Sequence, residues 1–241
     1  MDVQKLQESR DQIAYVMPSH QYPLGVVMPM KRRMELLEWA DGGDIRYIIE
    51  DDYDSEFRYV GKPIPALQGN DTKGRVIYIG TLSKSIAPAI RVSYMVLPER
   101  LLEAYEQYGS FISSTVSRID QRILEEFLRG GYYERHLNRM RTIYKSKRDV
   151  LMEEMKKLSS ICQVSGDRAG VHLLVRFTGN MTEKTAIRQA ARVGVKVYGL
   201  SDAGIAPTAD SNPATVLLGY GGLKQPEISA GVGLLADAWL K

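Results

Sequence analysis

The sequence predicts an α/β protein in which a mostly parallel sheet is followed by a smaller C-terminal α+β domain. Three observations lead to this fold class. Short apolar runs alternate with amphipathic segments over the first half of the chain. The runs show little polar alternation, which is typical of parallel strands covered on both faces. After a long helical stretch, a second and shorter group of strands and helices follows.

The first half contains four expected strands, each an apolar run bounded by Gly, Pro or polar residues. They are residues 13–17, 46–50, 75–81 and 91–97. Apolar positions at helical intervals among charged residues predict an amphipathic helix over residues 30–40, ended by Gly42-Gly43. Pro98 leads into another helix over residues 99–108. Strands separated by helices in this order favour a sheet whose strands run parallel.

The second half begins with two helices, residues 116–128 and 132–158, which are split by Gly130-Gly131. The second of them is long enough to link two bodies. We therefore expect residues 1–131 in a large domain, residues 132–158 as an interdomain helix and residues 159–241 in a small domain. The small domain is expected to contain strands at 172–177, 195–199 and 215–220, a helix with Thr182 as its N-cap, and a final helix after Pro226.

Composition bounds the function. The 241 residues are 44% hydrophobic, which is enough for a substantial core. A formal net charge of +3 is too balanced to indicate a nucleic-acid or membrane-surface protein. The one cysteine, Cys162, excludes an intrachain disulfide and a zinc site built from several cysteines, and it favours a reducing compartment. The start of the chain has no signal-peptide pattern, so we expect a cytoplasmic protein.

An acidic segment, residues 50–59, directly follows the second expected strand. Its first carboxylates therefore fall at the carboxyl end of a strand, where ligands of open α/β sheets bind. A solvated acidic turn explains the segment equally well when it is taken alone. A hard-cation site built from several of these carboxylates lacks the glycine that an EF-hand loop needs, and we expect no metal. The carboxylates considered are Asp51, Asp52, Asp54 and Glu56.

A second polar segment, GTLSKSIAPAIR, follows the third expected strand. Lys84 stands just beyond the strand among small hydroxyl residues, and Arg91 comes seven positions later. A surface lysine is the ordinary explanation of such a pair. A lysine beside a strand end can also lose water and act as an amine nucleophile. Hydroxyls and an arginine are suitable phosphate donors, so the acid, lysine and phosphate-binding groups together describe a site for pyridoxal 5'-phosphate (PLP).

Long motifs in a fixed order carry a family resemblance. The segments PSHQYPLG, RRMELLEWA, IIEDDYDSEFRY and VIYIGTLSKSIAPAIRVSYMVLP occur in this order, followed by GGYYERHLNRMRTIYKSKRDVL, AGVHLL and VKVYGLS. The chain resembles the aminotransferase-like domain of the MocR/GabR subfamily of GntR-type bacterial transcription regulators. The resemblance implies a PLP fold type I architecture and a homodimer. It also implies an N-terminal winged helix-turn-helix that binds DNA, and this chain would start in the middle of the large domain.

The resemblance assigns roles to individual residues. Lys84 would form the Schiff base with PLP, Asp51 would pair with the pyridine nitrogen, and Tyr53 would hydrogen-bond the phenolic oxygen. The phosphate would be held by Thr81, Ser83 and Arg91. Asp52, Asp54 and Glu56 would be supporting residues. Candidate effector-binding residues are His20, Tyr22 and Arg176.

Two departures from the wider aminotransferase pattern bear on the function. Tyr22 stands where ordinary aminotransferases carry the Asn of an N-P-x-G turn. Asp202 stands where the regulators often carry a carboxylate-binding arginine. Both departures favour effector sensing, in which a small amine or amino acid displaces Lys84 to form an external aldimine. The alternative is a catalytically active PLP-dependent aminotransferase of class I/II.

Two further expectations complete the sequence-based hypotheses. A direct nucleic-acid binder is a third reading, based on a basic run in the expected interdomain helix, although such a run is usually a solvated face. Its residues are Arg139, Arg141, Lys145, Lys147 and Arg148. Because the first part of the large domain would be missing, the phosphate site would be incomplete, and we expect weak PLP affinity for this chain.

Overall fold

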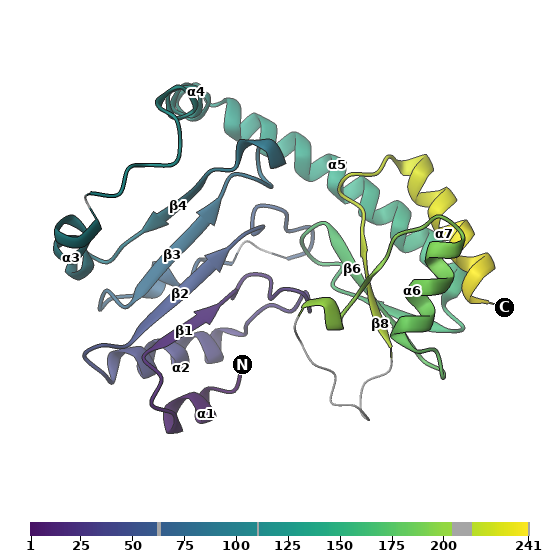
Figure 1. Cartoon of the computed structure of the whole chain (residues 1–241), viewed down its shortest axis with the longest axis horizontal. Helices are drawn as coiled ribbons and strands as arrows, with labels where there is room; N and C mark the ends of the chain where they lie inside the picture. The colour runs from purple at the N-terminus through teal and green to yellow at the C-terminus, as the bar shows by residue number, and fades with distance from the viewer. Residues whose placement is uncertain (62–63, 110, 204–213, 241) are drawn as a thin grey trace. The chain divides into compact units, whose positions relative to one another are not determined.

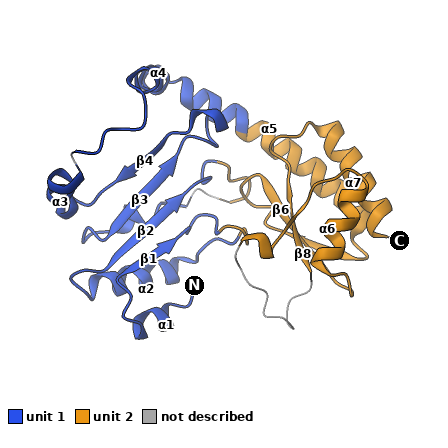
Figure 2. Ribbon diagram, in the orientation of Figure 1, with its two compact units in different colours: residues 1–21, 26–56, 62–140 blue, residues 22–25, 57–61, 141–241 orange. Residues whose placement is uncertain are grey.

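The computed structural model describes residues 1–61, 64–109, 111–203 and 214–240. The chain forms two compact units (Figure 2). Unit 1 comprises residues 1–21, 26–56 and 62–140, and unit 2 comprises residues 22–25, 57–61 and 141–241. The boundary between the two units falls after Met140, within the long helix that we expect to link two domains. Two short segments from the first half of the chain therefore belong to unit 2.

Unit 1 contains a four-stranded sheet in the order β1-β2-β3-β4 (Figure 1). The strands are β1 (Ile13–Val16), β2 (Tyr47–Asp52), β3 (Val76–Thr81) and β4 (Ser93–Val96). The pairs β1·β2 and β2·β3 are parallel, and β3·β4 is antiparallel. The predicted fold class, α/β with a mostly parallel sheet, is confirmed. The helices are α1 (Val3–Glu8), α2 (Met30–Asp41), α3 (Glu99–Gly109), α4 (Arg118–Arg129) and the start of α5 (Tyr132–Met155), with 3-10 turns at Gln68–Asn70 and Pro88–Ile90.

One face of this sheet packs on α2. Leu36, Leu37 and Trp39 of α2 are buried against Ala14 and Ile48 of the first two strands. The opposite face is more open, since the alternate β1 residues Ile13 and Tyr15 are 60% and 53% exposed. The expectation that both faces are covered is therefore wrong for β1. A short apolar run fits a half-covered strand as well as a fully buried one, because two inward residues suffice to anchor it.

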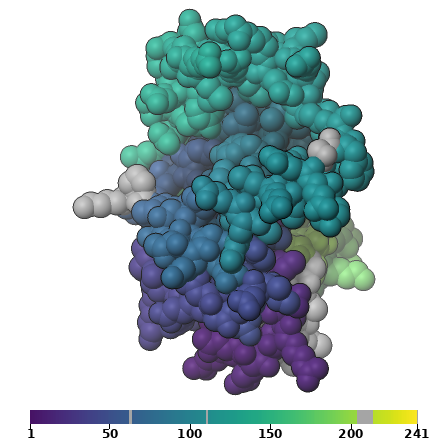
Figure 3. Space-filling view, turned by 90° about the vertical axis from the view of Figure 1, so that its left-hand side faces the viewer, coloured from purple at the N-terminus to yellow at the C-terminus, as the bar shows by residue number. Residues whose placement is uncertain are grey.

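Apolar side chains are also exposed on α3, α4 and the segment between them. Figure 3 shows the side of unit 1 where these helices lie, in teal. The exposed residues include Leu102, Tyr105, Tyr108, Phe111, Ile112, Ile119 and Ile123. Only Leu124 of α4 is buried.

Unit 2 contains a second sheet in the order β5-β6-β8-β7, in which every pair is antiparallel. Its strands are β5 (Cys162–Ser165), β6 (His172–Phe177), β7 (Tyr198–Gly199) and β8 (Thr215–Gly219). The helices are the rest of α5, α6 (Glu183–Arg192) and α7 (Gln225–Trp239), with 3-10 turns at Lys156–Leu158 and Ser201–Ala203. The smaller α+β architecture is as predicted, whereas β7 is shorter than the expected strand over 195–199, and α1 and β5 were not predicted.

The core of unit 2 lies between its sheet and the helices α5, α6 and α7. Phe177 meets Trp239 edge to face at 5.0 Å between ring centroids. The Trp239 indole N–H donates to the carbonyl of Ala186 at 3.1 Å, which ties α7 to α6. Thr182 caps α6 by accepting a hydrogen bond from the Thr185 N–H, as predicted. Within the described residues, no helix combines the length and apolar character needed to cross a membrane.

The two short segments of unit 2 are held by hydrogen bonds to residues much later in the chain. The His172 imidazole Nε2 donates to the Pro23 carbonyl at 3.2 Å. The Tyr59 hydroxyl donates to the Gly170 carbonyl at 2.7 Å, and the Tyr220 hydroxyl donates to the same oxygen at 2.8 Å. Gly170 has a φ of 73°, which glycine adopts without strain.

Candidate functional site

The register of the sheet in unit 1 places three polar side chains on one face. Tyr15 lies opposite Ile49, and Asp51 lies opposite Ile79, two residues before Thr81. Because side chains alternate along a strand, Tyr15, Asp51 and Thr81 all lie on the face away from α2. Asp51 and Thr81 lie at the carboxyl ends of neighbouring parallel strands. This is the edge where ligands of open α/β sheets bind.

Asp51 has a hydroxyl partner that the sequence did not reveal. The Tyr15 hydroxyl donates a hydrogen bond to Asp51 Oδ2. Partial burial, followed by the hydrogen bond to Asp51 and the charge of that carboxylate, raises the pKa of Tyr15 to about 12. Tyr15 therefore keeps its proton at neutral pH and acts as the donor in this pair. Alternation along β1 could have placed Tyr15 on the open face, but no motif indicated its contact with Asp51.

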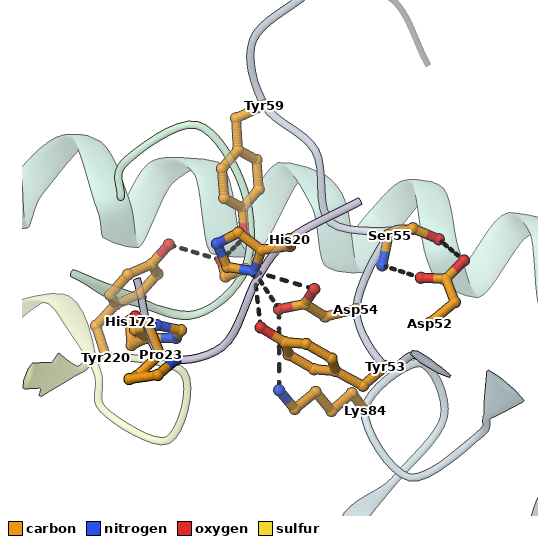
Figure 4. Close-up of polar contacts among 11 residues, drawn as sticks. His20, Pro23, Asp52, Tyr53, Asp54, Ser55, Tyr59, Lys84, His172 and Tyr220 are labelled. Atoms are coloured by element: carbon orange, nitrogen blue, oxygen red, sulfur yellow. Dashed lines mark hydrogen bonds and ion pairs between the residues drawn. The ribbon is translucent and has the colours of Figure 1, made fainter. Parts of the chain in front are cut away.

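The loop after β2 contributes Tyr53 and Asp54, which meet His20 from the loop after β1 (Figure 4). His20 Nδ1 lies 2.9 Å and 3.1 Å from the two carboxylate oxygens of Asp54, and 3.1 Å from the Tyr53 hydroxyl. Asp54 and His20 are almost fully buried, with 1% and 2% of their surface exposed. A buried carboxylate needs such a partner because burial without one is costly.

Lys84 reaches the same cluster from the loop after β3 (Figure 4). Its Nζ lies 3.9 Å from Asp54 Oδ2 and 4.1 Å from the centroid of the Tyr53 ring. Burial lowers the pKa of the Lys84 amine, while the negative charges of Asp54, Asp51 and Glu56 oppose this shift. An amine with a lowered pKa is a better nucleophile near neutral pH than an ordinary lysine.

The three residues expected to bind phosphate lie at the end of β3 and in the loop that leads to β4. The Thr81 hydroxyl accepts from the Ser83 N–H at 3.2 Å and donates to the Val92 carbonyl at 3.3 Å. Arg91 Nη1 donates to the Ser83 hydroxyl at 3.2 Å. Arg91 is in the left-handed conformation, with a φ of 48°. The structure thus brings Thr81, Ser83 and Arg91 together as hydrogen-bonding groups.

The acidic segment, residues 50–59, begins inside β2 and is not a solvated turn. Asp52 accepts from the Ser55 hydroxyl at 2.6 Å and from the Tyr78 hydroxyl at 2.7 Å. Glu56 accepts from the Tyr133 hydroxyl at 3.4 Å, and burial raises the pKa of its carboxyl. These contacts support the adjoining loop. Among the residues that the structure describes, no three His, Cys, Asp or Glu side chains are placed to hold a metal ion.

The three candidate effector residues lie in different places. His20 belongs to the Asp54 cluster of unit 1. Tyr22 belongs to unit 2, where it meets His172 edge to face and lines a pocket of about 340 Å³. Asp202 lines the same pocket and accepts from the Gly199 N–H at 3.0 Å. Arg176 is exposed on β6, four residues from His172 along the strand, and is not among the described residues that line this pocket.

Comparison with known proteins identifies the family. The profile of the aminotransferase class I and II family matches residues 2–208. An uncharacterized HTH-type transcriptional regulator, YhdI of Bacillus subtilis, is 42% identical over 94% of this chain and 48% of its own length. The probable rhizopine catabolism regulatory protein MocR of Rhizobium meliloti is 34% identical over 95% of this chain and 46% of its own length. The predicted resemblance to regulators of this type is confirmed.

Solved structures give the same fold. Kynurenine aminotransferase of Pyrococcus horikoshii, solved with PMP, has a TM-score of 0.81 at 27% sequence identity. The match covers 97% of this chain and 57% of the aminotransferase chain. The multiple substrate aminotransferase of Thermococcus profundus has a TM-score of 0.83 at 28% identity, over 98% of this chain and 58% of its own. This chain spans about half the length of the curated regulators it matches. By its sequence profile and its fold, the chain belongs to the aminotransferase class I and II family.

Proposed function

We propose that this chain is the PLP-binding, effector-sensing part of a MocR/GabR-type transcription regulator. The position of Lys84 is the observation that carries this proposal. Its amine is partly withdrawn from water beside a buried carboxylate, in the loop that follows the strand end next to Asp51. The similarity to YhdI and MocR supports a regulator, and the family supports PLP as the cofactor.

The residues of unit 1 fit PLP by their chemistry. PLP supplies an aldehyde for an amine and a pyridine ring that withdraws electrons when its nitrogen is protonated. Lys84 is the amine in this proposal, and Asp51 is the carboxylate that would hold the proton at the pyridine nitrogen. Tyr53 would donate to the phenolic oxygen. Thr81, Ser83 and Arg91 offer two hydroxyls and a guanidinium to the phosphate, which binds best to charged and directed donors.

The chain's own groups prepare the site in two ways. Burial of the Lys84 amine favours its neutral form, which carries the lone pair that an aldehyde requires. The Tyr15 hydroxyl donates to Asp51, which restrains the carboxylate that a pyridine N–H needs. Both effects act before any ligand arrives, so the groups need little rearrangement to bind one.

A working aminotransferase is the second candidate, because solved structures that are similar to this chain include aminotransferases. Two residues favour sensing. Tyr22 stands in place of the turn asparagine, and Asp202 lines the pocket of unit 2 where an arginine would be expected to hold an α-carboxylate. A small amine or amino acid as effector, a homodimer, a cytoplasmic location and DNA binding through a winged helix-turn-helix outside these residues are parts of the same proposal.

The basic run on α5 gives little support to direct nucleic-acid binding. Arg148 is largely buried, stacks over the Tyr59 ring at 5.4 Å and donates to the Asp167 carbonyl at 3.2 Å. Lys147 donates to the Gly221 carbonyl at 2.8 Å. Both cations are thus engaged within unit 2, and the run is not a continuous free basic surface.

Reductive trapping tests the PLP proposal even at weak affinity. The chain is incubated with PLP and reduced with borohydride, and the modified lysines are identified by peptide mass spectrometry. We expect label concentrated at Lys84 and lost in Lys84→Ala, whereas Lys31→Ala, which removes a lysine whose side chain is 90% exposed, leaves the Lys84 label unchanged. Label spread evenly over the surface lysines would contradict the proposal. Turnover of an amino acid with a keto acid would favour the aminotransferase alternative.

A further inference from the structure

A buried acid–imidazole pair, Asp54 and His20, lies beside the Lys84 amine. Asp54 comes from the loop after β2, His20 from the loop after β1 and Lys84 from the loop after β3, so three separate loops of unit 1 converge here (Figure 4). The Asp54 carboxylate is almost fully buried, and its oxygens face two groups, the His20 imidazole and the Lys84 amine. The roles assigned above to Asp54 (a supporting residue) and to His20 (a candidate effector-binding residue) do not include an action of the pair on Lys84.

The other acidic groups near Lys84 are directed elsewhere. Asp51 accepts from the Tyr15 hydroxyl, Asp52 from Ser55 and Tyr78, and Glu56 from Tyr133. Asp51 and Glu56 also act on Lys84 electrostatically, but less strongly than Asp54. Asp54 is the carboxylate that the structure places within ion-pair distance of the Lys84 amine, at 3.9 Å.

We propose that Asp54 is the counter-ion of Lys84 and that His20 is the residue that positions it. His20 Nδ1 lies within hydrogen-bond distance of both Asp54 oxygens, which restrains the direction in which the carboxylate points. The Tyr53 hydroxyl lies near the same nitrogen, and the Tyr53 ring lies under the Lys84 ammonium. The His20 imidazole therefore lies against both groups that Lys84 contacts.

The physical role of the pair follows from burial. A partly buried ammonium loses water, which favours loss of its proton, and a nearby carboxylate opposes this by favouring the charged form. With Asp54 nearby, Lys84 Nζ therefore loses its proton at a higher pH than it would if burial acted alone. Since the amine must lose that proton to attack a carbonyl carbon, the pair sets the pH at which Lys84 becomes a nucleophile. This inference rests on the proposed function for its biological meaning, but not for its test.

The test measures the reactivity of Lys84 without PLP. The chain is treated with a trace of acetic anhydride over a range of pH, and the extent of acetylation at each lysine is read by peptide mass spectrometry. In Asp54→Asn, which keeps the size of the side chain and one acceptor oxygen but removes the charge, we expect the Lys84 profile to move to lower pH. An opposite charge at this distance commonly moves a pKa by about one unit or more, so at a pH below the midpoint Lys84 should react about tenfold faster.

The chain provides a matched control. Lys31 Nζ lies 3.9 Å from Glu35 Oε1, the same separation as in the Lys84–Asp54 pair, but the Lys31 side chain is 90% exposed. Water screens such a pair. Glu35→Gln should therefore change the reactivity of Lys31 by less than about twofold, within the small effect of an exposed ion pair.

Two His20 variants test positioning separately from charge. His20→Asn retains a donor near the place of Nδ1 and should keep the Lys84 profile, while His20→Leu removes the donor and should move the profile to lower pH. An Asp54→Asn profile that coincides with that of the parent chain overturns the proposal. If Asp54→Asn does not fold, the proposal is overturned when the Lys84 acetylation profile of His20→Leu coincides with that of the parent chain. PLP is absent from every acetylation measurement. The outcome of these measurements therefore does not depend on whether the trapping experiment detects PLP binding.

Discussion

The carbonyl of Gly170 in unit 2 accepts hydrogen bonds from two tyrosine hydroxyls, Tyr59 and Tyr220, and this arrangement makes a sharp prediction about stability. Either Tyr→Phe change alone removes one neutral hydrogen bond and leaves the other donor on the carbonyl. Each single variant should therefore lower the free energy of unfolding by about 0.5–1.5 kcal/mol. The double variant removes both donors from a carbonyl in a buried glycine.

The cost of the double variant should exceed the sum of the two single costs. A buried acceptor that is left without a donor costs about 1–3 kcal/mol, which is more than the cost of losing one hydrogen bond while another donor stays in place. We expect an excess of about 1 kcal/mol or more, which is well above the roughly 0.3–0.5 kcal/mol within which independent sites add. Phe at either position keeps the ring, so the packing of Tyr59 under Arg148 is retained.

Urea unfolding followed by tryptophan fluorescence can report on unit 2 by itself. The chain has two tryptophans, Trp39 in unit 1 and Trp239 in unit 2. In a Trp39→Phe background, Trp239 is therefore the sole reporter. Tyr198→Phe, at an exposed tyrosine of unit 2, should change stability by less than about 0.5 kcal/mol. Strict additivity of the two buried changes, with unchanged denaturant slopes, would refute the reasoning.

Three other predictions concern single side chains. Leu36→Ala, at a fully buried position in the core of unit 1, should lower the free energy of unfolding by about 2–5 kcal/mol, measured by urea unfolding with Trp39 fluorescence. The pKa of Tyr15 is raised to about 12, so the stability that its protonated hydroxyl contributes is complete below pH 10 and is lost as the pH rises through 12. Asp51→Asn should lower the pKa of Tyr15, which a titration of phenolate absorbance measures. Burial raises the pKa of Cys162 to about 11, so a disulfide reagent should react with it slowly at pH 8 and rapidly once urea unfolds unit 2.

The sequence predicted the elements whose pattern is local. The strands of unit 1 are apolar runs that end at Pro or polar residues, and α2 and α6 have ordinary helix boundaries, so their positions could be inferred without tertiary information. The strand β5, by contrast, has the short and partly polar sequence CQVS, and it is a strand because it pairs with β6. The reduced length of β7 has the same origin, since two residues of it pair with β8.

The candidate site divides in a similar way. Its position at the ends of β2 and β3 could be predicted because parallel strands end at one edge of a sheet. The roles of Asp51 and Lys84 came from the family resemblance and stay predictions. The contact between Tyr15 and Asp51, and the approach of His20 to Asp54, could not be predicted, because each joins residues more than 30 positions apart. The first contact depends on the pairing of β1 with β2, and the second on the packing of two separate loops.

The discontinuous make-up of unit 2 has a consequence for the order in which the protein can fold during synthesis. Pro23 is 149 residues from His172 and Tyr59 is 111 residues from Gly170, so both early segments leave the ribosome long before their partners exist. Unit 2 cannot reach its final structure until the C-terminal part of the chain has emerged. Contacts between such distant residues generally slow folding, so the nascent chain must keep these early segments available until their partners have emerged.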